Sequence, residues 1–345
     1  MTIETNIFVG DQANLAFGPE WDELAANSTL STVFQTTGWY RAWLETVAAA
    51  ESVVPLVIEV RSDAYLRAAV ALQIRSLGKQ MILEPLSTPW ADYHEAIGIP
   101  NDRDAARRLN SAMQELAGAH NWRIVCDNVL PGGLLDCALN ASGYKRVRSS
   151  TIAVLDLMDR DHMKRILTRK EYTVKWRRLS RLGTVACVHH DTCEAILERL
   201  PLFIRMHQEQ WKERNDVVAP FEGGTVNKAF EAIVRHLAPV HRICLTELVL
   251  DEKPIAMYYG FLDGKAYRAY RTCFSQIHYR LSPGHLMLQR MISDFVAAGL
   301  REFDFMRGSY PYKFGYTNRC RYNICIATTN IHSVSSHQSL AGEIS

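Results

Sequence analysis

Hydrophobic and polar positions alternate most regularly in the last third of the chain. Arg242 to Leu250, Pro254 to Leu262 and Lys265 to Cys273 each have the pattern of a β-strand, and short polar turns separate them. The second turn contains Gly264, and glycine readily takes the positive φ that a tight hairpin requires. The sequence therefore predicts an antiparallel meander of three strands.

The period of the pattern changes after this meander. Gly284 to Ala298 has apolar residues at the spacing of one helical face, Gly299 is suited to stop the helix, and Arg301 to Phe305 is again a strand. The expected buried stripe consists of Leu288, Met291, Ile292, Phe295 and Val296. Strand, helix and strand form a βαβ unit whose strands run parallel, so we expect a mixed sheet.

The first half of the chain has the same order of elements. Val54 to Val60 and Tyr65 to Ile74 predict a hairpin, Asp102 to Ala119 a helix, and Trp122 to Cys126 a strand. We therefore expect an α/β protein with two domains of one architecture, each a mixed, mostly antiparallel sheet flanked by helices. The domains are placed at residues 1–150 and 151–328, with a loose polar tail over residues 329–345.

Composition narrows the class of protein. The chain has 345 residues, 48% of them hydrophobic, which suffices for two globular cores. The net charge of +2 gives no global attraction to nucleic acid, so we expect no DNA partner. No export signal and no apolar run of membrane-spanning length is apparent, and the eight cysteines form no CxxC pair. We therefore expect free buried thiols and a cytoplasmic location.

The start of the predicted helix Gly284 to Ala298 is a candidate anion site. The mixed strand directions open a crevice at the strand ends, and the helix enters it at Ser282-Pro283-Gly284. The backbone N–H groups of a helix N-terminus carry roughly half a positive charge and bind phosphate. Arg280 lies just upstream and adds a charged contact. The alternative is an ordinary turn from loop to helix.

A basic segment precedes this region. Residues 164–181 carry eight cationic side chains against one acid, Glu171, and the segment from Asp161 to Leu182 is predicted to be helical. Such a helix is usually a solvated surface. Here it is also suited to the 3′-phosphate of CoA, a nucleotide-linked sugar, tRNA or an anionic membrane surface.

Two further groups of polar residues are candidates for acid–base chemistry or for metal binding. Asp304 ends a short apolar strand, where it is either a structural carboxylate or a general base that neutralises an attacking amine. Ligand-type residues gather between Cys187 and Cys193, but neighbouring residues of a strand point to opposite faces, and no second cluster has zinc spacing. We therefore expect no metal. The sequence has no G-x-S-x-G, Walker or HExxH motif, which argues against hydrolases, NTPases and zincins.

Three stretches together resemble a known family. They are Phe34 to Trp43 with Trp90-Ala91-Asp92-Tyr93, the basic helix Lys175 to Gly183, and Ser282 through Gly308 to Tyr312-Lys313. The pattern resembles the GNAT (Gcn5-related N-acetyltransferase) fold. More specifically, it is similar to the two-domain subgroup related to the Fem peptidyltransferases, which includes the CelD/BcsL-like acetyltransferases of cellulose and exopolysaccharide loci.

The resemblance implies a donor site. In such folds the loop before the central helix holds the pyrophosphate of acyl-CoA. The corresponding residues in this sequence are Arg280, Ser282, Gly284, His285 and Leu286. The usual Q/R-x-x-G-x-G/A loop is degenerate here, since Leu286 stands in place of the second glycine. The Fem branch uses aminoacyl-tRNA instead of acyl-CoA, so both donors remain open.

The resemblance also implies catalytic and acceptor-binding residues. A lysine matching Lys313 lies near the reacting carbonyl in the Fem branch, where a cation stabilises the oxyanion; the alternative is a surface lysine. Tyr312 either protonates a thiolate leaving group or packs. His207 faces the substrate cleft or is simply a packed histidine. The residues expected to contact the substrate are Trp90, Asp92, Tyr93, Trp211 and Tyr270.

The leading hypothesis is therefore an acyltransferase. It would move an acyl group, in the first instance acetyl, from acyl-CoA to an amine or hydroxyl of a small-molecule or saccharide acceptor, in polysaccharide or cell-envelope biosynthesis. The alternatives are a Fem-like transferase that uses aminoacyl-tRNA, and a non-catalytic partner in a polysaccharide-assembly complex. Peripheral contact with a membrane is compatible with the basic helix.

Overall fold

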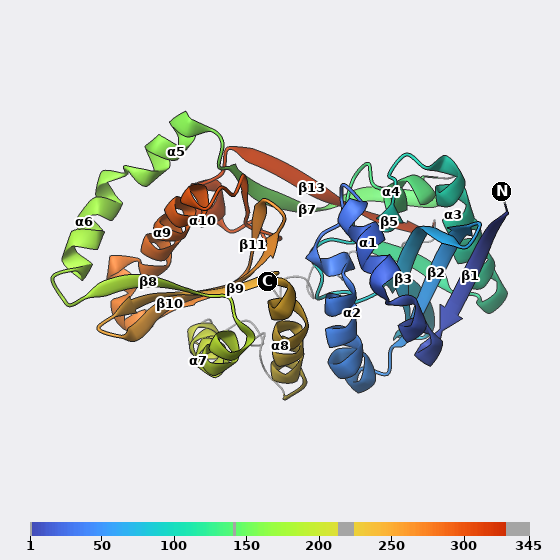
Figure 1. Cartoon of the computed structure of the whole chain (residues 1–345), viewed down its shortest axis with the longest axis horizontal. Coiled ribbons are helices and arrows are strands. Elements are labelled where there is room, and N and C mark those ends of the chain that lie inside the picture. Colours follow the sequence, from blue (N-terminus) through green and yellow to red (C-terminus); the bar gives the residue numbers. More distant parts are fainter. Residues whose placement is uncertain (1, 141–142, 213–223, 329–345) are drawn as a thin grey trace. The chain divides into compact units, whose positions relative to one another are not determined.

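The chain folds into two compact units in the computed structural model, which describes residues 2–140, 143–212 and 224–328 (Figure 1). The first unit runs to Thr151 and takes up the chain again from Tyr322, and the second comprises Ile152–Arg321. The expected domain of residues 151–328 thus differs in its last strand, which belongs to the first unit. The predicted tail over residues 329–345 lies outside the described residues.

The first unit is built on a mixed sheet. Its strands follow the order β1-β2-β3-β4-β6-β13, and α3 is the crossover between the parallel strands β4 and β6. The bounds are β1 Ile3–Val9, α1 Pro19–Asn27, α2 Thr37–Trp43, β2 Val54–Ser62, β3 Tyr65–Leu77, β4 Gln80–Pro85, β5 Ile97–Gly98, α3 Arg103–His120, β6 Arg123–Val129, α4 Leu134–Ala138, β7 Tyr144–Asp156 and β13 Arg319–Thr328. Leu109 and Met113 of α3 are fully buried against this sheet, in the core of the unit.

The second unit repeats this plan. Its sheet has the order β7-β12-β11-β10-β9-β8, and α9 is the crossover between the parallel strands β11 and β12. The bounds are α5 Arg160–Leu167, α6 Lys170–Leu179, β8 Val185–His190, α7 Cys193–Lys212, α8 Gly224–Leu237, β9 Ile243–Leu250, β10 Lys253–Asp263, β11 Ala266–Phe274, the 3-10 turn η5 Gln276–Leu281, α9 Pro283–Ala297, β12 Glu302–Asp304 and α10 Pro311–Phe314. Figure 1 shows α5, α6 and α9 on one face of the sheet and α7 and α8 on the other.

The expected fold class, tandem mixed α/β units, is confirmed, with local differences. Four residues of the predicted stripe on α9 are buried, but Val296 is 40% exposed because it lies at the edge of that stripe. The predicted helix from Asp161 to Leu182 is two helices, because Arg169 between them has φ of −59° and ψ of 120°, outside the helical region. All eight cysteines are free, and Cys320 is exposed.

The pairing of β11 explains how the second unit forms a cavity. β11 pairs with β12 only as far as Arg268 opposite Asp304, so the rest of β11 is not covered by β12. On the other side, Tyr259 pairs with Arg271 and Gly260 with Ala269, which leaves Tyr270 as the extra residue of a β-bulge. A bulge re-aims side chains and increases local twist. The open half of β11 therefore presents consecutive side chains beside the start of α9.

None of the helices within the described ranges combines the length and the apolar character needed to cross a membrane.

Candidate functional site

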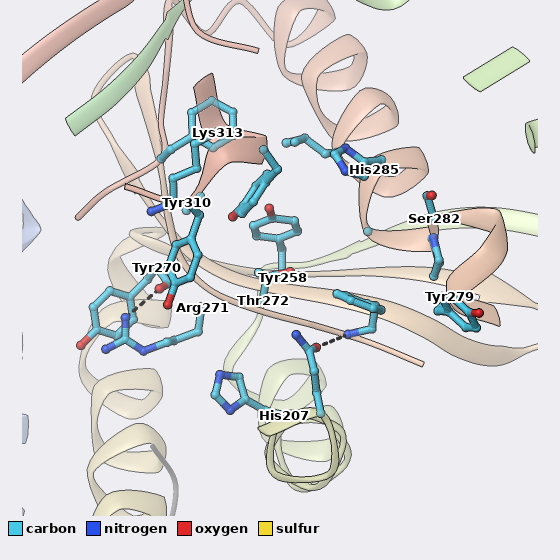
Figure 2. Close-up of a pocket in the computed structure, with 18 of the residues that line it drawn as sticks. His207, Tyr258, Tyr270, Arg271, Thr272, Tyr279, Ser282, His285, Tyr310 and Lys313 are labelled. Atoms are coloured by element: carbon cyan, nitrogen blue, oxygen red, sulfur yellow. Dashed lines mark hydrogen bonds between the residues drawn. The ribbon is translucent and has the colours of Figure 1, made fainter. Parts of the chain in front are cut away.

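The open half of β11 forms one wall of a cavity of about 550 Å³ within the second unit (Figure 2). Seven of the residues expected to act at a site lie along its wall: His207, Tyr270, Ser282, Gly284, His285, Tyr312 and Lys313. They come from α7, β11, the start of α9 and α10, which are far apart in sequence. The fold thus gathers most of the predicted catalytic and donor-binding residues in one place.

The N-terminus of α9 forms one end of the cavity. Ser282 is its N-cap and has φ of 54°, and Lys175 of α6 donates from Nζ to Ser282 Oγ at 2.8 Å. The N–H groups of His285 and Leu286 already donate to the Ser282 carbonyl, at 3.0 and 3.1 Å, so these two amides are not the open donors that the sequence led us to expect. The positive end of the helix and the Lys175 ammonium together make this end attractive to an anion.

His285 lies just inside this end, within a stack of aromatic rings. Its ring is stacked with those of Tyr172 and Tyr316, and Nδ1 lies 3.2 and 3.1 Å from their hydroxyl oxygens. Burial lowers the pKa of His285, and the nearby charge of Lys175 lowers it further. His285 is therefore held in its neutral form, as a hydrogen-bonding group without charge.

Lys313 is a buried cation at another part of the wall. It is 5% exposed, on the short helix α10, and its Nζ donates to the carbonyls of Met306, at 3.4 Å, and Arg307. These two carbonyls fix the position of the ammonium. A fixed cation in a place with little water is well suited to stabilise negative charge that develops on a reacting carbonyl.

Tyrosine hydroxyls lie along the floor of the cavity. Tyr258 of β10 is buried and hydrogen-bonded to Tyr312 and to Thr272. Burial raises the pKa of Tyr258 well above its ordinary value, so that hydroxyl stays protonated at physiological pH. Tyr312 therefore belongs to a hydrogen-bonded chain of hydroxyls, which supports the predicted transfer of a proton to a leaving group.

The helix α7 closes the opposite side. His207 is buried and lines the cavity, and Gln210 Oε1, one turn away, accepts from the Phe274 N–H of β11 at 2.9 Å. This bond satisfies a backbone donor on the open half of β11. Trp211 lies in α7 as well, and its side chain is outside the described residues.

Several predicted residues do not line the cavity. Arg280 is exposed and its Nε donates to the Tyr279 hydroxyl at 3.2 Å, and Leu286 is fully buried in the core. Trp90, Asp92 and Tyr93 belong to the first unit, so they are not part of a cavity that the second unit forms by itself; Asp92 and Tyr93 are each 2% exposed.

Asp304 is the predicted catalytic residue whose position differs most from expectation. It is fully buried, and its Oδ2 accepts from Arg268 Nη1 at 2.7 Å while Oδ1 accepts from the Met306 N–H at 2.8 Å. It is not among the residues that line the cavity. Because its carboxylate is fully buried, paired with a guanidinium and away from the cavity wall, these contacts favour the structural role for Asp304.

Three residues with metal-ligating side chains lie close together elsewhere. Cys187 and His189 share one face of β8, and they meet Asp294 of α9, with ligand atoms within 4.8 Å of one another. Asp294 also pairs with Arg290, whose Nε lies 3.0 Å away. Because this guanidinium already compensates the only carboxylate of the cluster, we propose no metal there.

Part of the cavity wall consists of residues that the sequence did not predict to act at a site. Arg271, Thr272 and Phe274 follow Tyr270 on β11, and Arg307 and Tyr310 precede the predicted Tyr312 and Lys313. In a regular strand, Tyr270 and Arg271 would point to opposite faces. Only the bulge places both in the cavity, and nothing in the local sequence signals it.

Comparison with known proteins agrees with this geometry. Residues 167–314 match the family model described as an acetyltransferase (GNAT) domain. This part of the chain is similar to GNAT acetyltransferase domains. The match spans α6, the meander, α9 and Lys313, and hence the whole wall of the cavity described above. The sequence as a whole matches no curated protein.

Solved structures resemble both units together. FemX shares 12% identity over 93% of this chain and 98% of its own, with a TM-score of 0.66. A tandem GNAT protein from the clavulanic acid biosynthesis pathway shares 14% identity over 94% of this chain and 98% of its own, with a TM-score of 0.50. The C-terminal domain of a putative lysylphosphatidylglycerol synthetase from Agrobacterium fabrum shares 12% over 79% and 84%, with a TM-score of 0.55. At such low identity these likenesses show the fold, and the expected GNAT and Fem-related fold is confirmed.

Proposed function

We propose that this chain transfers an acyl group, in the first instance acetyl, from acyl-CoA to an amine or hydroxyl of a small-molecule or saccharide acceptor. The observation that carries the proposal is the cavity of the GNAT-like domain, which has an anion-binding end at α9 and a buried ammonium at Lys313. A role in polysaccharide or cell-envelope biosynthesis is the setting that the sequence resemblance favours.

The donor end follows from charge. The pyrophosphate of acyl-CoA binds at the start of α9, where Lys175 and Ser282 lie 2.8 Å apart and the helix end is positive. Gly284 keeps this approach open, since a Cβ there would meet only Phe274 Cδ1, at 3.5 Å. The thioester then extends into the cavity along the open half of β11.

The chemical step needs positioning and charge stabilisation. The acceptor nitrogen or oxygen attacks the thioester carbonyl, Lys313 stabilises the oxyanion, and the C–S bond breaks as the new bond forms. The proton lost by the acceptor passes to the CoA sulfur through Tyr312 and the hydroxyl chain with Tyr258. His207, which lines the cavity from α7, is positioned to contact the acceptor.

A pair of ligands tests the donor end. Acetyl-CoA and acetyl-pantetheine differ in the phosphates, so Lys175→Ala should weaken acetyl-CoA binding by about tenfold and leave acetyl-pantetheine unchanged. Calorimetric titration measures both affinities. Lys170→Ala is the matched control, because it removes an exposed lysine of the same helix. Absence of heat with acetyl-CoA and a longer acyl-CoA would refute acyl-CoA as the donor.

One observation favours aminoacyl-tRNA as a second candidate donor. Exposed cations of α5, α6 and the turn after α6 continue from Lys175 along the surface of the GNAT-like domain: Lys164, Arg165, Lys170, Arg177, Arg178 and Arg181. A charged tRNA held there would bind with a steep dependence on salt concentration, whereas acetyl-CoA would show a shallow one. Titrating charged tRNA at two salt concentrations distinguishes the donors. If neither donor binds, the chain is a non-catalytic binding partner.

A further inference from the structure

The cavity wall has an unbalanced charge. Among the described residues, it contains the cations Arg271, Arg307 and Lys313 and neither an aspartate nor a glutamate. A cavity that collects cations without carboxylates attracts an anionic ligand. The phosphates of acyl-CoA account for the α9 end under the function proposed above, so the question is whether one of these three residues binds a second anion.

Arg271 is the most informative of them. Its guanidinium carbon lies 4.1 Å above the ring centre of Tyr270, and its Nη1 donates to the Tyr270 carbonyl at 2.9 Å. Within the described parts of the chain, it forms no ion pair and its Nε and Nη2 make no hydrogen bond. Two contacts with the bulged residue thus hold the guanidinium flat, and the remaining donors suit a carboxylate or phosphate.

Its neighbour Arg268 shows what a structural arginine of this strand looks like. Arg268 is 9% exposed and contacts two carboxylates, Asp263 at 2.8 Å and Asp304 at 2.7 Å. Arg271 lies on the same strand, but it pairs with no carboxylate among the described residues. Packing and ion pairing therefore explain Arg268, but they do not explain Arg271.

The position of Arg271 separates it from the donor phosphates. Figure 2 shows Arg271, Tyr270, Tyr310 and Lys313 on one side of the cavity, and His285, Ser282 and Tyr279 on the other. An anion on Arg271 would therefore lie beyond the reacting carbonyl, on the acceptor side.

We infer that the acceptor carries an anionic group, a carboxylate or a phosphate, which Arg271 binds while the acceptor's amine faces the thioester beside Lys313. This inference rests on the proposed function. Arg271 is then a specificity-determining residue, because a neutral acceptor would leave its guanidinium without a partner.

The charge of Arg271 also removes the need for a carboxylate base. A nearby guanidinium disfavours an ammonium, so an amine binds here more readily in its neutral form. The neutral nitrogen attacks the thioester carbonyl, the C–N bond forms, and the C–S bond breaks. The extra proton on nitrogen passes to the CoA thiolate, which leaves as the thiol, so no oxidant, reductant or further reactant is required.

Three probes with one skeleton test the inference. Glucosamine has no anionic group, glucosamine 6-phosphate carries a phosphate, and glucosaminic acid carries a carboxylate. We expect the anionic probe of the right class to bind the CoA-saturated protein at least about tenfold more tightly than glucosamine. Arg271→Gln should abolish that preference and Arg271→Lys should retain part of it. Arg301→Gln, an exposed arginine of the same unit, should change nothing.

The outcomes distinguish a failure of the anionic acceptor from a failure of the acyl-CoA donor. Equal affinity for all three probes, or a preference that survives Arg271→Gln in a folded protein, overturns the anionic acceptor even where CoA binds. Thermal melting establishes that each variant is folded. If CoA fails to bind, the donor proposal fails, and the probes are titrated against the free protein with the same criterion for Arg271.

Discussion

Two arginines of β11 illustrate how environment, rather than residue type, decides a role. Arg268 pairs with Asp263 and with the fully buried Asp304, and these ion pairs give both Arg268 and Asp304 a structural role. Arg271, three residues later, lies in the cavity, and Tyr270 is the one hydrogen-bond partner of its side chain in the part of the chain that the structure describes. At the scale of single residues, we therefore expect the proposed transfer to use fixed cations and hydroxyls and not a carboxylate.

Lys313 is the residue whose removal should cost most in turnover. Because the Met306 and Arg307 carbonyls hold its ammonium in place, Lys313→Ala removes a preorganised charge, and we expect kcat to fall by about 10²–10³-fold. The measurement is the release of CoA thiol by purified protein. Acetyl-CoA affinity should change little, since the phosphates bind at the α9 end.

An inactive variant alone would not establish this role. Lys265→Ala is the comparison, because it removes an exposed lysine at the start of β11, outside the cavity. Unchanged turnover in folded Lys313→Ala would exclude an oxyanion role for the lysine.

The neutral state of His285 predicts how stability depends on pH. Burial first, and then Lys175, lower its pKa in the folded state below the ordinary value of about 6.5. The unfolded chain consequently binds more protons in the window just below 6.5, so stability falls as the pH drops through that window and is complete above it. Melting temperatures between pH 5 and 8, about the range in which histidine titrates, measure this.

His285→Gln should flatten that dependence, since glutamine does not titrate. His278→Gln serves as the control, because His278 lies outside the ring stack of Tyr172, His285 and Tyr316. If the two variants had the same pH profile as the unmodified chain, His285 would not be the group responsible.

At the scale of elements, the bulge in β11 determines which side chains reach the cavity. It lies opposite Gly260 of β10, where the two backbones approach closely. A Cβ at Gly260 would lie 2.3 Å from the Tyr267 hydroxyl and 2.5 Å from the Arg268 carbonyl oxygen. The hydroxyl can move, but the backbone of Arg268 is held by the paired strands and by its two ion pairs.

Gly260→Ala should therefore lower the free energy of unfolding by about 1–3 kcal/mol, as overpacking does in other cores. Chemical denaturation of the full chain measures it. Gly118→Ala, on α3 with nothing within 4 Å of the added Cβ, should be neutral or slightly stabilising. Equal effects of the two substitutions would contradict the close approach at the bulge.

At the scale of the whole molecule, the two units share a plan but differ at the N-terminus of the crossover helix, which is α3 in the first unit and α9 in the second. α9 begins at Ser282 beside Lys175, and so attracts anions. The equivalent helix α3 begins at Asp102, whose carboxylate accepts from the Ala105 N–H at 3.1 Å and from Arg67 at 2.6 and 2.7 Å. The chain's own carboxylate thus occupies the anion-binding end of α3.

We accordingly expect one acetyl-CoA per chain, bound by the second unit alone. Calorimetric stoichiometry tests this, and a value of two would show that α3 also accepts a phosphate. Asp102→Ala should leave the stoichiometry of the second unit intact while destabilising the first unit by about 1–2 kcal/mol, because the cap of α3 is lost.

The sequence by itself determined the elements and their order. Local periodicity fixes the meander, the stripe of α9 and the βαβ crossover, because each depends on neighbours within a few turns. Lys313, His285 and Ser282 were also identifiable, through a resemblance that spans most of the chain. The break at Arg169 and the return of β13 to the first unit were not, since no glycine or proline marks the break and a long-range pairing decides the place of the strand.

Only the tertiary structure decided what the candidate residues can do. The sequence leaves Asp304 as either a structural carboxylate or a general base, and the arginine that pairs with it lies 36 residues away. Arg271 reads as a residue of the opposite face, and the bulge against β10 turns it into the cavity. Charge and proximity between distant segments set the acidity, burial and direction of a side chain, and these arise only once the strands have paired.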